Sequence, residues 1–191
     1  MSTGQLIVLT GPSGVGKGTL LRSLIQRHRD LRVSISVTTR SPRPGEVDGR
    51  DYYFVNREQF NRMIAENQFL EWAEFAGNCY GTPRKSVEEM LQSGNSVILE
   101  IELEGARQIQ QNFPDAVRIF ILPPSWEDLE HRLRGRGQDD DKAISRRLAR
   151  AAEEIAAAQE FSYQVTNDNL ERAVAEIESI LTASNSGKSV R

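Results

Sequence analysis

Gly11-Pro12-Ser13-Gly14-Val15-Gly16-Lys17-Gly18-Thr19 is the stretch that decides the fold of this 191-residue chain. The preceding run, Gln5-Leu6-Ile7-Val8-Leu9-Thr10, is short and apolar, as expected for a buried parallel strand. Residues 20–25 then place apolar side chains at the spacing of a helix face. A strand, a glycine-rich turn and the start of a helix form a setting in which backbone N–H groups bind phosphate. The stretch therefore predicts a phosphate-binding loop, rather than a glycine-rich turn with an exposed lysine.

The loop departs at one position from the pattern of nucleotide-hydrolysing proteins. Gly11, Gly16 and Lys17 satisfy G-x-x-x-x-G-K, but Gly18 stands where a serine or threonine hydroxyl usually contacts Mg²⁺. Two alternatives follow from this: Thr19 orients the metal, or nucleotide phosphates and water hold it. We expect Mg²⁺ to accompany the nucleotide, without a firm direct ligand from the protein.

Composition excludes several classes of function. The net charge is −3, which argues against a broad nucleic-acid-binding surface. One cysteine, Cys79, cannot form a disulfide within the chain, and with two histidines it cannot supply a typical zinc cluster. No apolar run approaches the ~20 residues of a membrane span. We expect a cytoplasmic protein with small-molecule partners and with neither membrane nor nucleic acid as a partner, whose oligomeric state the sequence does not specify.

The hydrophobic pattern predicts an α/β fold in which helices flank a parallel P-loop sheet. Alternation over residues 32–39 predicts one strand, and the run 51–55 is rich in β-forming residues. A helix is predicted over about 84–92, and Ser125 is expected to cap a later helix that runs to about residue 134. The short strands and helices between 35 and 93 interrupt the β-α-β order. We expect a single domain over 4–184. Its predicted parts are a core (4–34, 94–133 and 147–184), a small mixed α+β lobe (35–93), a mobile lid (134–146) and, beyond the domain, a disordered tail (185–191).

Two groups of arginines stand out. Arg40 and Arg43 lie in a turn-rich loop, where charge for solubility and a second anion site are equally compatible with the sequence. Arg132 and Arg147 lie at the edges of apolar helix faces, and Arg136 lies between them in a glycine-rich segment. Such arginines can cover core edges with their stems, but two helices that converge on one glycine-rich segment favour a lid that closes on polyphosphate.

With these motifs in place, residues 6–181 resemble the guanylate kinase family of nucleoside monophosphate kinases. The most specific piece is the run SVTTRSPRPGEVDGRDY at 36–52, and the runs FLEW at 69–72, NCYGT at 78–82 and RLRGRG at 132–137 also match. The resemblance implies transfer of the γ-phosphoryl group of ATP to GMP. Three positions depart from the family: Gly18, Glu102 in place of an aspartate found in some members, and Glu104 in place of a glutamine.

The resemblance also implies roles at the matching positions. ATP is expected at Gly11, Pro12, Ser13, Gly14, Val15, Gly16, Lys17, Gly18, Thr19 and Asn167. GMP is expected at Ser36, Arg40, Arg43, Glu46, Tyr52, Glu71, Tyr80, Thr82 and Glu102, of which Ser36, Glu71, Thr82 and Glu102 would hold the guanine. The catalytic charges are expected from Lys17, Arg40, Arg132, Arg136 and Arg147.

The choice of guanine has a chemical argument of its own. The pairing edge of guanine offers N–H donors, which carboxylates accept, and the acceptor O6, to which the hydroxyls of Ser36 and Thr82 could donate. Adenine would place a lone pair against a carboxylate, and such a site can reject the wrong base by roughly 10⁴-fold. The alternative function is a catalytically silent guanylate-kinase-like binding module, although the intact phosphate loop argues against it. A P-loop hydrolase or switch is a further rival, which the two arginine groups disfavour.

Overall fold

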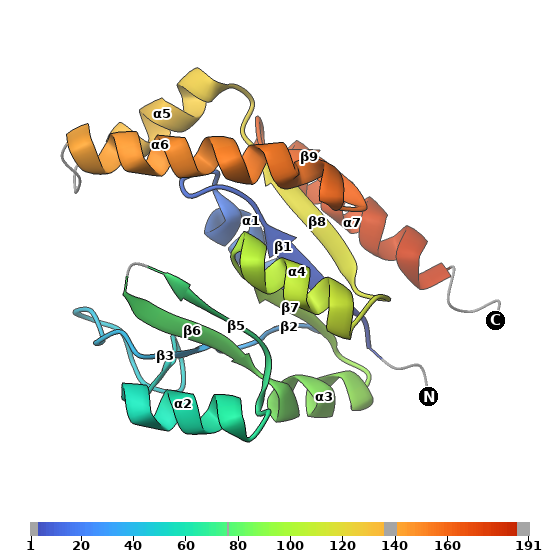
Figure 1. Ribbon diagram of the computed structural model, residues 1–191. Coiled ribbons are helices and arrows are strands. Elements are labelled where there is room, and N and C mark those ends of the chain that lie inside the picture. Colours follow the sequence, from blue (N-terminus) through green and yellow to red (C-terminus); the bar gives the residue numbers. More distant parts are fainter. Residues whose placement is uncertain (1–3, 76, 136–140, 187–191) are drawn as a thin grey trace. The chain divides into compact units, whose positions relative to one another are not determined.

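A computed structural model describes residues 4–75, 77–135 and 141–186, with side chains as far as residue 184 (Figure 1). The chain divides into two compact units. The first comprises Met1–Ile7 and Asp30–Ala116, and the second comprises Val8–Arg29 and Val117–Arg191. The predicted division of a single domain over 4–184 into core, lobe and lid stays a prediction.

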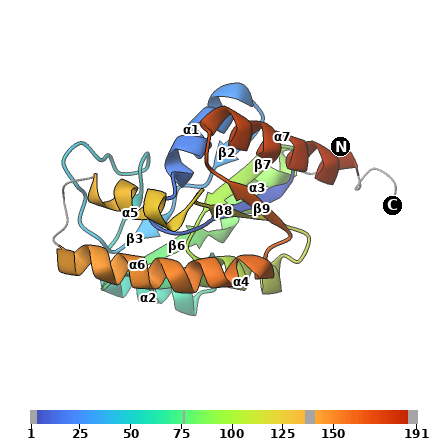
Figure 2. The same ribbon diagram turned by 90° about the horizontal axis from the view of Figure 1, so that it is seen from above.

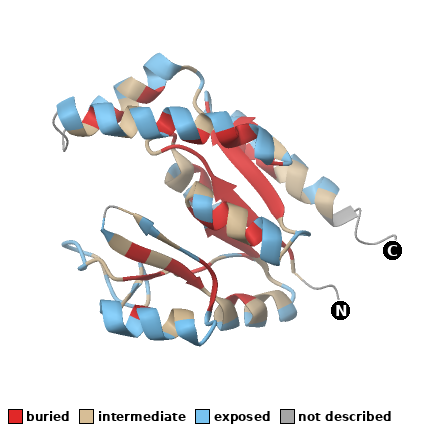
Figure 3. Ribbon diagram, in the orientation of Figure 1, coloured by how far each residue is buried: buried red, intermediate tan, exposed pale blue. Residues whose placement is uncertain are grey.

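A five-stranded sheet carries the α/β architecture that the sequence predicts. Its order is β2 (Leu31–Val33), β7 (Ser96–Glu100), β1 (Leu6–Thr10), β8 (Val117–Leu122) and β9 (Tyr163–Thr166). The β2–β7 and β8–β9 pairs are parallel. Every residue of β1 is buried, as is nearly all of β8 (Figure 3), which is why both strands are mostly apolar without alternation, Arg118 in β8 being the charged exception.

The first unit contains a second, mixed sheet. Its order is β4 (Tyr53–Phe54), β3 (Val37–Thr38), β6 (Asn78–Pro83) and β5 (Phe69–Phe75), with β3–β4 parallel and the other pairs antiparallel. The helices of this unit are α2 (Arg57–Ala65), α3 (Arg84–Gln92) and α4 (Leu103–Asn112). Phe60 of α2 packs with Phe69 of β5 and Cys79 of β6, so α2 and this sheet share a hydrophobic cluster.

The predicted continuous strand over 32–39 is wrong. The structure divides it into β2 and β3, which belong to different sheets. Between them the Ser34 N–H donates to the carbonyl of Ile98 in β7, whereas the Ser36 carbonyl accepts from Tyr53, the first residue of β4. Alternating side chains report only which face of a strand is buried, not which strand pairs with it, so the change of partner was invisible in the sequence.

The second unit holds α1 (Lys17–Arg27), α5 (Trp126–Arg134), α6 (Asp141–Ala156), the 3₁₀ turn η1 (Ala157–Glu160) and α7 (Leu170–Ser186). Helices α5 and α6 lie side by side (Figure 2), and Leu129 and Leu133 pack against Ala151 there. Ser125 caps α5 by accepting from the Asp128 N–H, as predicted.

Helix α7 continues to Ser186, and the expected disordered tail over 185–191 stays a prediction. Residues 187–191 lie outside the described part of the chain. Among the described residues, none of the helices is long and apolar enough to cross a membrane.

Candidate functional site

The phosphate loop owes its shape to three glycines in left-handed or extended positive-φ conformations. Gly11, Gly14 and Gly16 have φ values of 145°, 87° and 101°. A side chain would also lack space, because a Cβ on Gly11 would lie 2.4 Å from the Ile121 carbonyl oxygen. These positions explain why only glycine satisfies the loop between β1 and α1.

Lys17 begins α1 and turns back over the loop. Its ammonium group donates to the carbonyls of Gly11 and of Pro12, the latter at 3.3 Å. The lysine is half-buried, so its charge is held beside the loop rather than extended into solvent. A polyphosphate bound by the loop would meet this charge directly.

Asn167 and Arg132 both bind the loop backbone at Val15. The side-chain amide of Asn167 donates to the Val15 carbonyl at 2.8 Å, and an Arg132 nitrogen donates to the same oxygen at 3.1 Å. The other terminal nitrogen of Arg132 donates to the Asn167 carbonyl at 3.0 Å. A Cβ on Gly16 would lie 2.5 Å from the Asn167 amide nitrogen. Asn167 and Arg132 therefore fix the position of the phosphate loop.

The loop offers little to a metal ion. Gly18 has no hydroxyl, and the Thr19 hydroxyl accepts from Arg22 at 3.1 Å on the exposed side of α1. Within 4–75, 77–135 and 141–186, no group of three acidic, histidine or cysteine side chains could hold a metal. This donor set fits a Mg²⁺ that nucleotide oxygens and water coordinate, since Mg²⁺ commonly keeps several waters beside substrate phosphates.

The arginines in and beside the expected lid differ in their surroundings. Arg147 on α6 is half-buried, while its neighbour Arg146 is exposed, as the helical geometry predicts. Arg134 ends α5 and forms ion pairs with Glu130 and with Asp141, the first residue of α6. Arg136 lies outside the described residues.

In the first unit, Arg40 is held by Glu46. Its guanidinium donates to Glu46 Oε1 at 2.9 Å and to the Ser41 carbonyl at 2.7 Å. The other carboxylate oxygen of Glu46 accepts from the Arg43 backbone N–H at 2.7 Å. The Arg40 hydrogen bond lowers the pKa of Glu46, and the same contact raises the pKa of Arg40. Glu46 thus joins both arginines of the loop, although the Arg43 side chain itself is exposed.

Two tyrosines lie close to Arg40. Its guanidinium carbon is 5.3 Å from the centre of the Tyr52 ring, and the Tyr52 and Tyr80 rings are 6.2 Å apart in an edge-to-face arrangement. Burial raises the pKa of the Tyr52 hydroxyl, and proximity to Tyr80 raises it further. A phenol hydroxyl is a hydrogen-bond donor, so Tyr52 and Tyr80 can both donate to an anion beside Arg40.

Glu71 on β5 is a buried carboxylate. Thr82 lies opposite it on β6, and the Thr82 hydroxyl donates to Glu71 Oε1 at 2.5 Å. Burial raises the pKa of Glu71 to about 7, although the bonds from Thr82 work in the opposite direction. In this arrangement Thr82 donates its single hydroxyl proton to Glu71. The hydroxyl therefore positions the carboxylate and is not available to donate to a base.

The second predicted base-reading carboxylate, Glu102, immediately precedes α4 as its N-cap residue. Gly105, in the first turn of the same helix, lies against Glu71: a Cβ there would be 2.2 Å from Glu71 Oε2. Glu71 and Glu102 therefore both lie at the N-terminal end of α4. Ser36 lies before β3 and is half-buried. Sequence reasoning missed Gly105, because nothing local distinguishes it from any helical glycine.

Comparison with known proteins decides the family. The guanylate kinase family model matches residues 3–184. The chain belongs to the guanylate kinase family. It is 63% identical over 177 residues to a guanylate kinase of Trichormus variabilis, covering 93% of this chain and 89% of that protein. It is 62% identical over 181 residues to a guanylate kinase of Trichodesmium erythraeum, covering 95% and 97%.

Solved structures agree with this guanylate kinase assignment. The crystal structure of guanylate kinase from Anaplasma phagocytophilum has a TM-score of 0.78 and 37% identity, covering 95% of this chain and 86% of that one. A shikimate kinase from Bacteroides thetaiotaomicron, at 18% identity and a TM-score of 0.51 over 93% and 98% of the two chains, shares the fold. The family, α/β fold class and guanylate kinase activity that the sequence predicts are confirmed.

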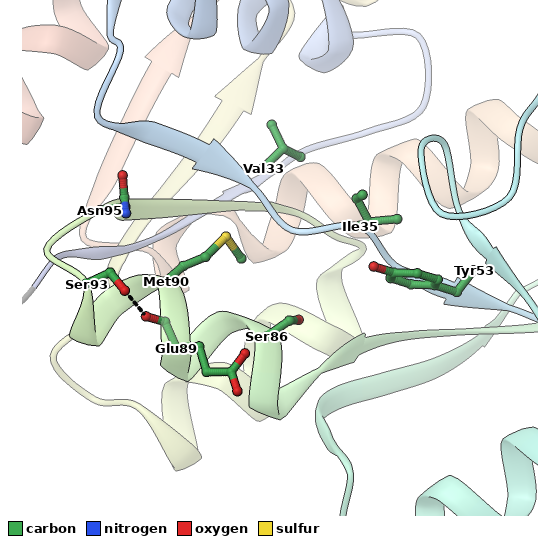
Figure 4. A pocket seen from close by; sticks show the side chains of 8 residues that line it. All are labelled: Val33, Ile35, Tyr53, Ser86, Glu89, Met90, Ser93 and Asn95. Carbon is green, nitrogen blue, oxygen red and sulfur yellow. Dashed lines mark hydrogen bonds between the residues drawn. The ribbon is translucent and has the colours of Figure 1, made fainter.

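This guanylate kinase family member has a further hollow in its first unit (Figure 4). It measures about 330 Å³ and lies between the end of β2 and α3, with Val33, Ile35, Tyr53 and Met90 among its lining residues. None of the predicted site residues lines it.

Proposed function

We propose that the chain transfers the γ-phosphoryl group of ATP directly to GMP, giving ADP and GDP. A phosphate oxygen of GMP attacks the γ-phosphorus, and the bond from that phosphorus to the β–γ bridging oxygen breaks. The second pKa of a phosphate monoester is about 6, so the nucleophile is ionised at pH 7 and needs no dedicated general base. The protein's task is therefore alignment and charge stabilisation.

On the donor side, the phosphate loop and Lys17 bind the polyphosphate of ATP. Loop N–H groups and the start of α1 supply partial positive charge, and Lys17 supplies a full one. Arg132 and Asn167 keep the loop in shape through the Val15 carbonyl. Mg²⁺ bound to the nucleotide oxygens supplies further neutralising charge. Arg136, expected in the lid, and Arg147, which follows the lid, are further charges for the transferred group.

On the acceptor side, Arg40 is the central cation for the phosphate of GMP. Glu46 fixes the plane of its guanidinium, and the phenols of Tyr52 and Tyr80 lie beside it as additional donors. Arg43 follows in the same loop with its side chain exposed, where it can reach an incoming phosphate. A planar guanidinium held in this way matches phosphate oxygens in pairs.

The observation that carries the choice of GMP is the buried carboxylate of Glu71. It accepts from the Thr82 hydroxyl on the opposite strand, and burial, which disfavours the charged carboxylate, raises its pKa to about 7. A buried acceptor in this state gains most from a ligand with N–H donors, which the pairing edge of guanine supplies. Glu102 at the start of α4 adds a second acceptor, and Ser36 remains as donor to O6.

One assay tests this function against its rivals. ADP release is measured with GMP, AMP, CMP, UMP or no acceptor. We expect rapid ADP release with GMP alone and slow turnover without it. Release at one rate regardless of acceptor would indicate a hydrolase, and absence of release with every acceptor would indicate a silent binding module.

A further inference from the structure

Gly105 lies in the first turn of α4, in direct contact with the buried carboxylate of Glu71. A Cβ built on Gly105 would lie 2.2 Å from Glu71 Oε2, 3.0 Å from Cδ and 3.5 Å from Cγ. The first distance is far inside the sum of the van der Waals radii and the second is below it, so even the smallest side chain at 105 would push the carboxyl group of Glu71 aside. The glycine and Glu71 belong to the same compact unit, and α4 packs along β5.

The backbone does not explain this glycine. Gly105 is absent from the positions with positive φ, and it lies inside a regular helix that runs from Leu103 to Asn112. Alanine is the better helix former at such a position, because glycine loses more conformational entropy on folding. The reason for glycine is therefore its contact with Glu71, not local conformation.

The carboxyl group cannot simply rotate away. Glu71 Oε1 is fixed by the Thr82 hydroxyl at 2.5 Å, and the residue is 5% exposed, so little free space surrounds it. Moving Oε2 by the distance that a methyl group requires would break the bond to Thr82 or rotate the acceptor out of its plane. In either case the direction in which Glu71 accepts hydrogen bonds would change.

We propose that Gly105 is a specificity-determining positioning residue for the guanine base. Its missing side chain leaves the space in which the Glu71 carboxyl group lies against the first turn of α4, in the orientation that accepts from the base. The inference rests on the proposed function, because it assigns to Glu71 the reading of the N–H groups of GMP. Gly105 itself does not touch the substrate in this account.

The direct test is Gly105→Ala in the full-length chain. We expect KM for GMP to rise about tenfold or more, the loss of one well-placed hydrogen bond to a charged group, while KM for ATP changes less than about twofold. Preference for GMP over IMP, which lacks the 2-amino donor, should fall by a similar factor. Gln111→Ala, an exposed position on the same helix, is the matched control and should leave both KM values unchanged.

A double-mutant cycle with Glu71→Ala separates this contact from a general effect on folding. When the carboxyl group is absent, Gly105→Ala should no longer raise KM for GMP, and it should no longer lower Tm. Equal losses of Tm from Gly105→Ala with and without Glu71 would overturn the inference, even if the single variant folds poorly. The proposed reading of guanine fails separately, if Glu71→Ala alone leaves KM for GMP unchanged.

Discussion

The side-chain amide of Asn167 donates to the carbonyl of Val15 at 2.8 Å, which links the end of β9 to the phosphate loop. The residues are 152 positions apart in the chain, and Asn167 is buried. Arg132 donates to the same carbonyl, so one backbone oxygen of the loop is held from two other segments of its unit. The phosphate loop is positioned from outside as well as by its own glycines.

Asn167→Ala removes one of the two donors to the Val15 carbonyl. We expect kcat/KM for ATP to fall about tenfold and the free energy of unfolding to drop by about 1–2 kcal/mol, the cost of an unmade buried hydrogen bond. KM for GMP should stay unchanged. Steady-state kinetics and urea unfolding measure both effects, with Gln164→Ala, an exposed residue on β9, as the control. Equal losses for both nucleotides would argue against a specific effect on the loop.

Lys17→Met tests the charge beside the loop. The substitution keeps the apolar stem and removes the ammonium group, so we expect kcat to fall by about 10²-fold or more, as for other groups that stabilise transition-state charge. Tm should change little. Lys85→Met on α3 is the control, because that lysine is exposed and forms a long ion pair of 3.9 Å with Glu89. An unchanged kcat for Lys17→Met would remove Lys17 from the mechanism.

Glu46→Gln tests whether Arg40 must be held in place. The carboxylate joins the Arg40 guanidinium to the Arg43 backbone N–H, and an amide can keep only part of this arrangement. We expect KM for GMP to rise about tenfold and KM for ATP to stay constant. The control is Glu58→Gln, whose carboxylate on α2 is 85% exposed. If GMP binds equally well to both variants, Arg40 does not depend on Glu46.

Glu71 predicts a dependence of stability on pH. Burial raises its pKa from the ordinary value of 4.5 to about 7, so between these values the unfolded chain releases a proton that the folded chain keeps. This contribution to stability is fully present below pH 4.5 and is lost as pH rises through 7. Glu71→Gln cannot lose a proton. From pH 4 to pH 8, the free energy of unfolding of the natural chain should therefore fall by up to about 3 kcal/mol relative to that of Glu71→Gln.

Urea unfolding at both pH values measures this difference. Glu74→Gln, on the same strand but with half of its side chain exposed, is the control for removing a carboxylate from β5. Parallel pH profiles for the natural chain and Glu71→Gln would contradict the raised pKa.

Local signals explain what the sequence predicted well. The glycines of the phosphate loop have conformations that no other residue readily adopts, and the α5 cap at Ser125 depends on a residue three positions away. Both features are complete within a few residues. The same holds for α3, which spans the predicted residues 84–92.

Long-range contacts explain the rest. Gly105 has an ordinary helical backbone. Glycine is needed there because of the carboxylate of Glu71, which lies 34 positions earlier in the chain. Arg132 was placed on the correct edge of α5, but its contacts to Val15 and Asn167 involve segments 117 and 35 residues away. Likewise, the chain passes from one sheet to the other at residues 34–36 because Ser34 and Ser36 bond to different strands, not because of their own composition.

The measurement that tests the central claim most directly follows the γ-phosphate of ATP. ATP labelled at that phosphate is incubated with the enzyme and GMP, and GDP, ADP and inorganic phosphate are separated. We predict that label appears in GDP in a one-to-one ratio with ADP formed, with little inorganic phosphate. Label released as inorganic phosphate at the same rate with and without GMP would contradict the account.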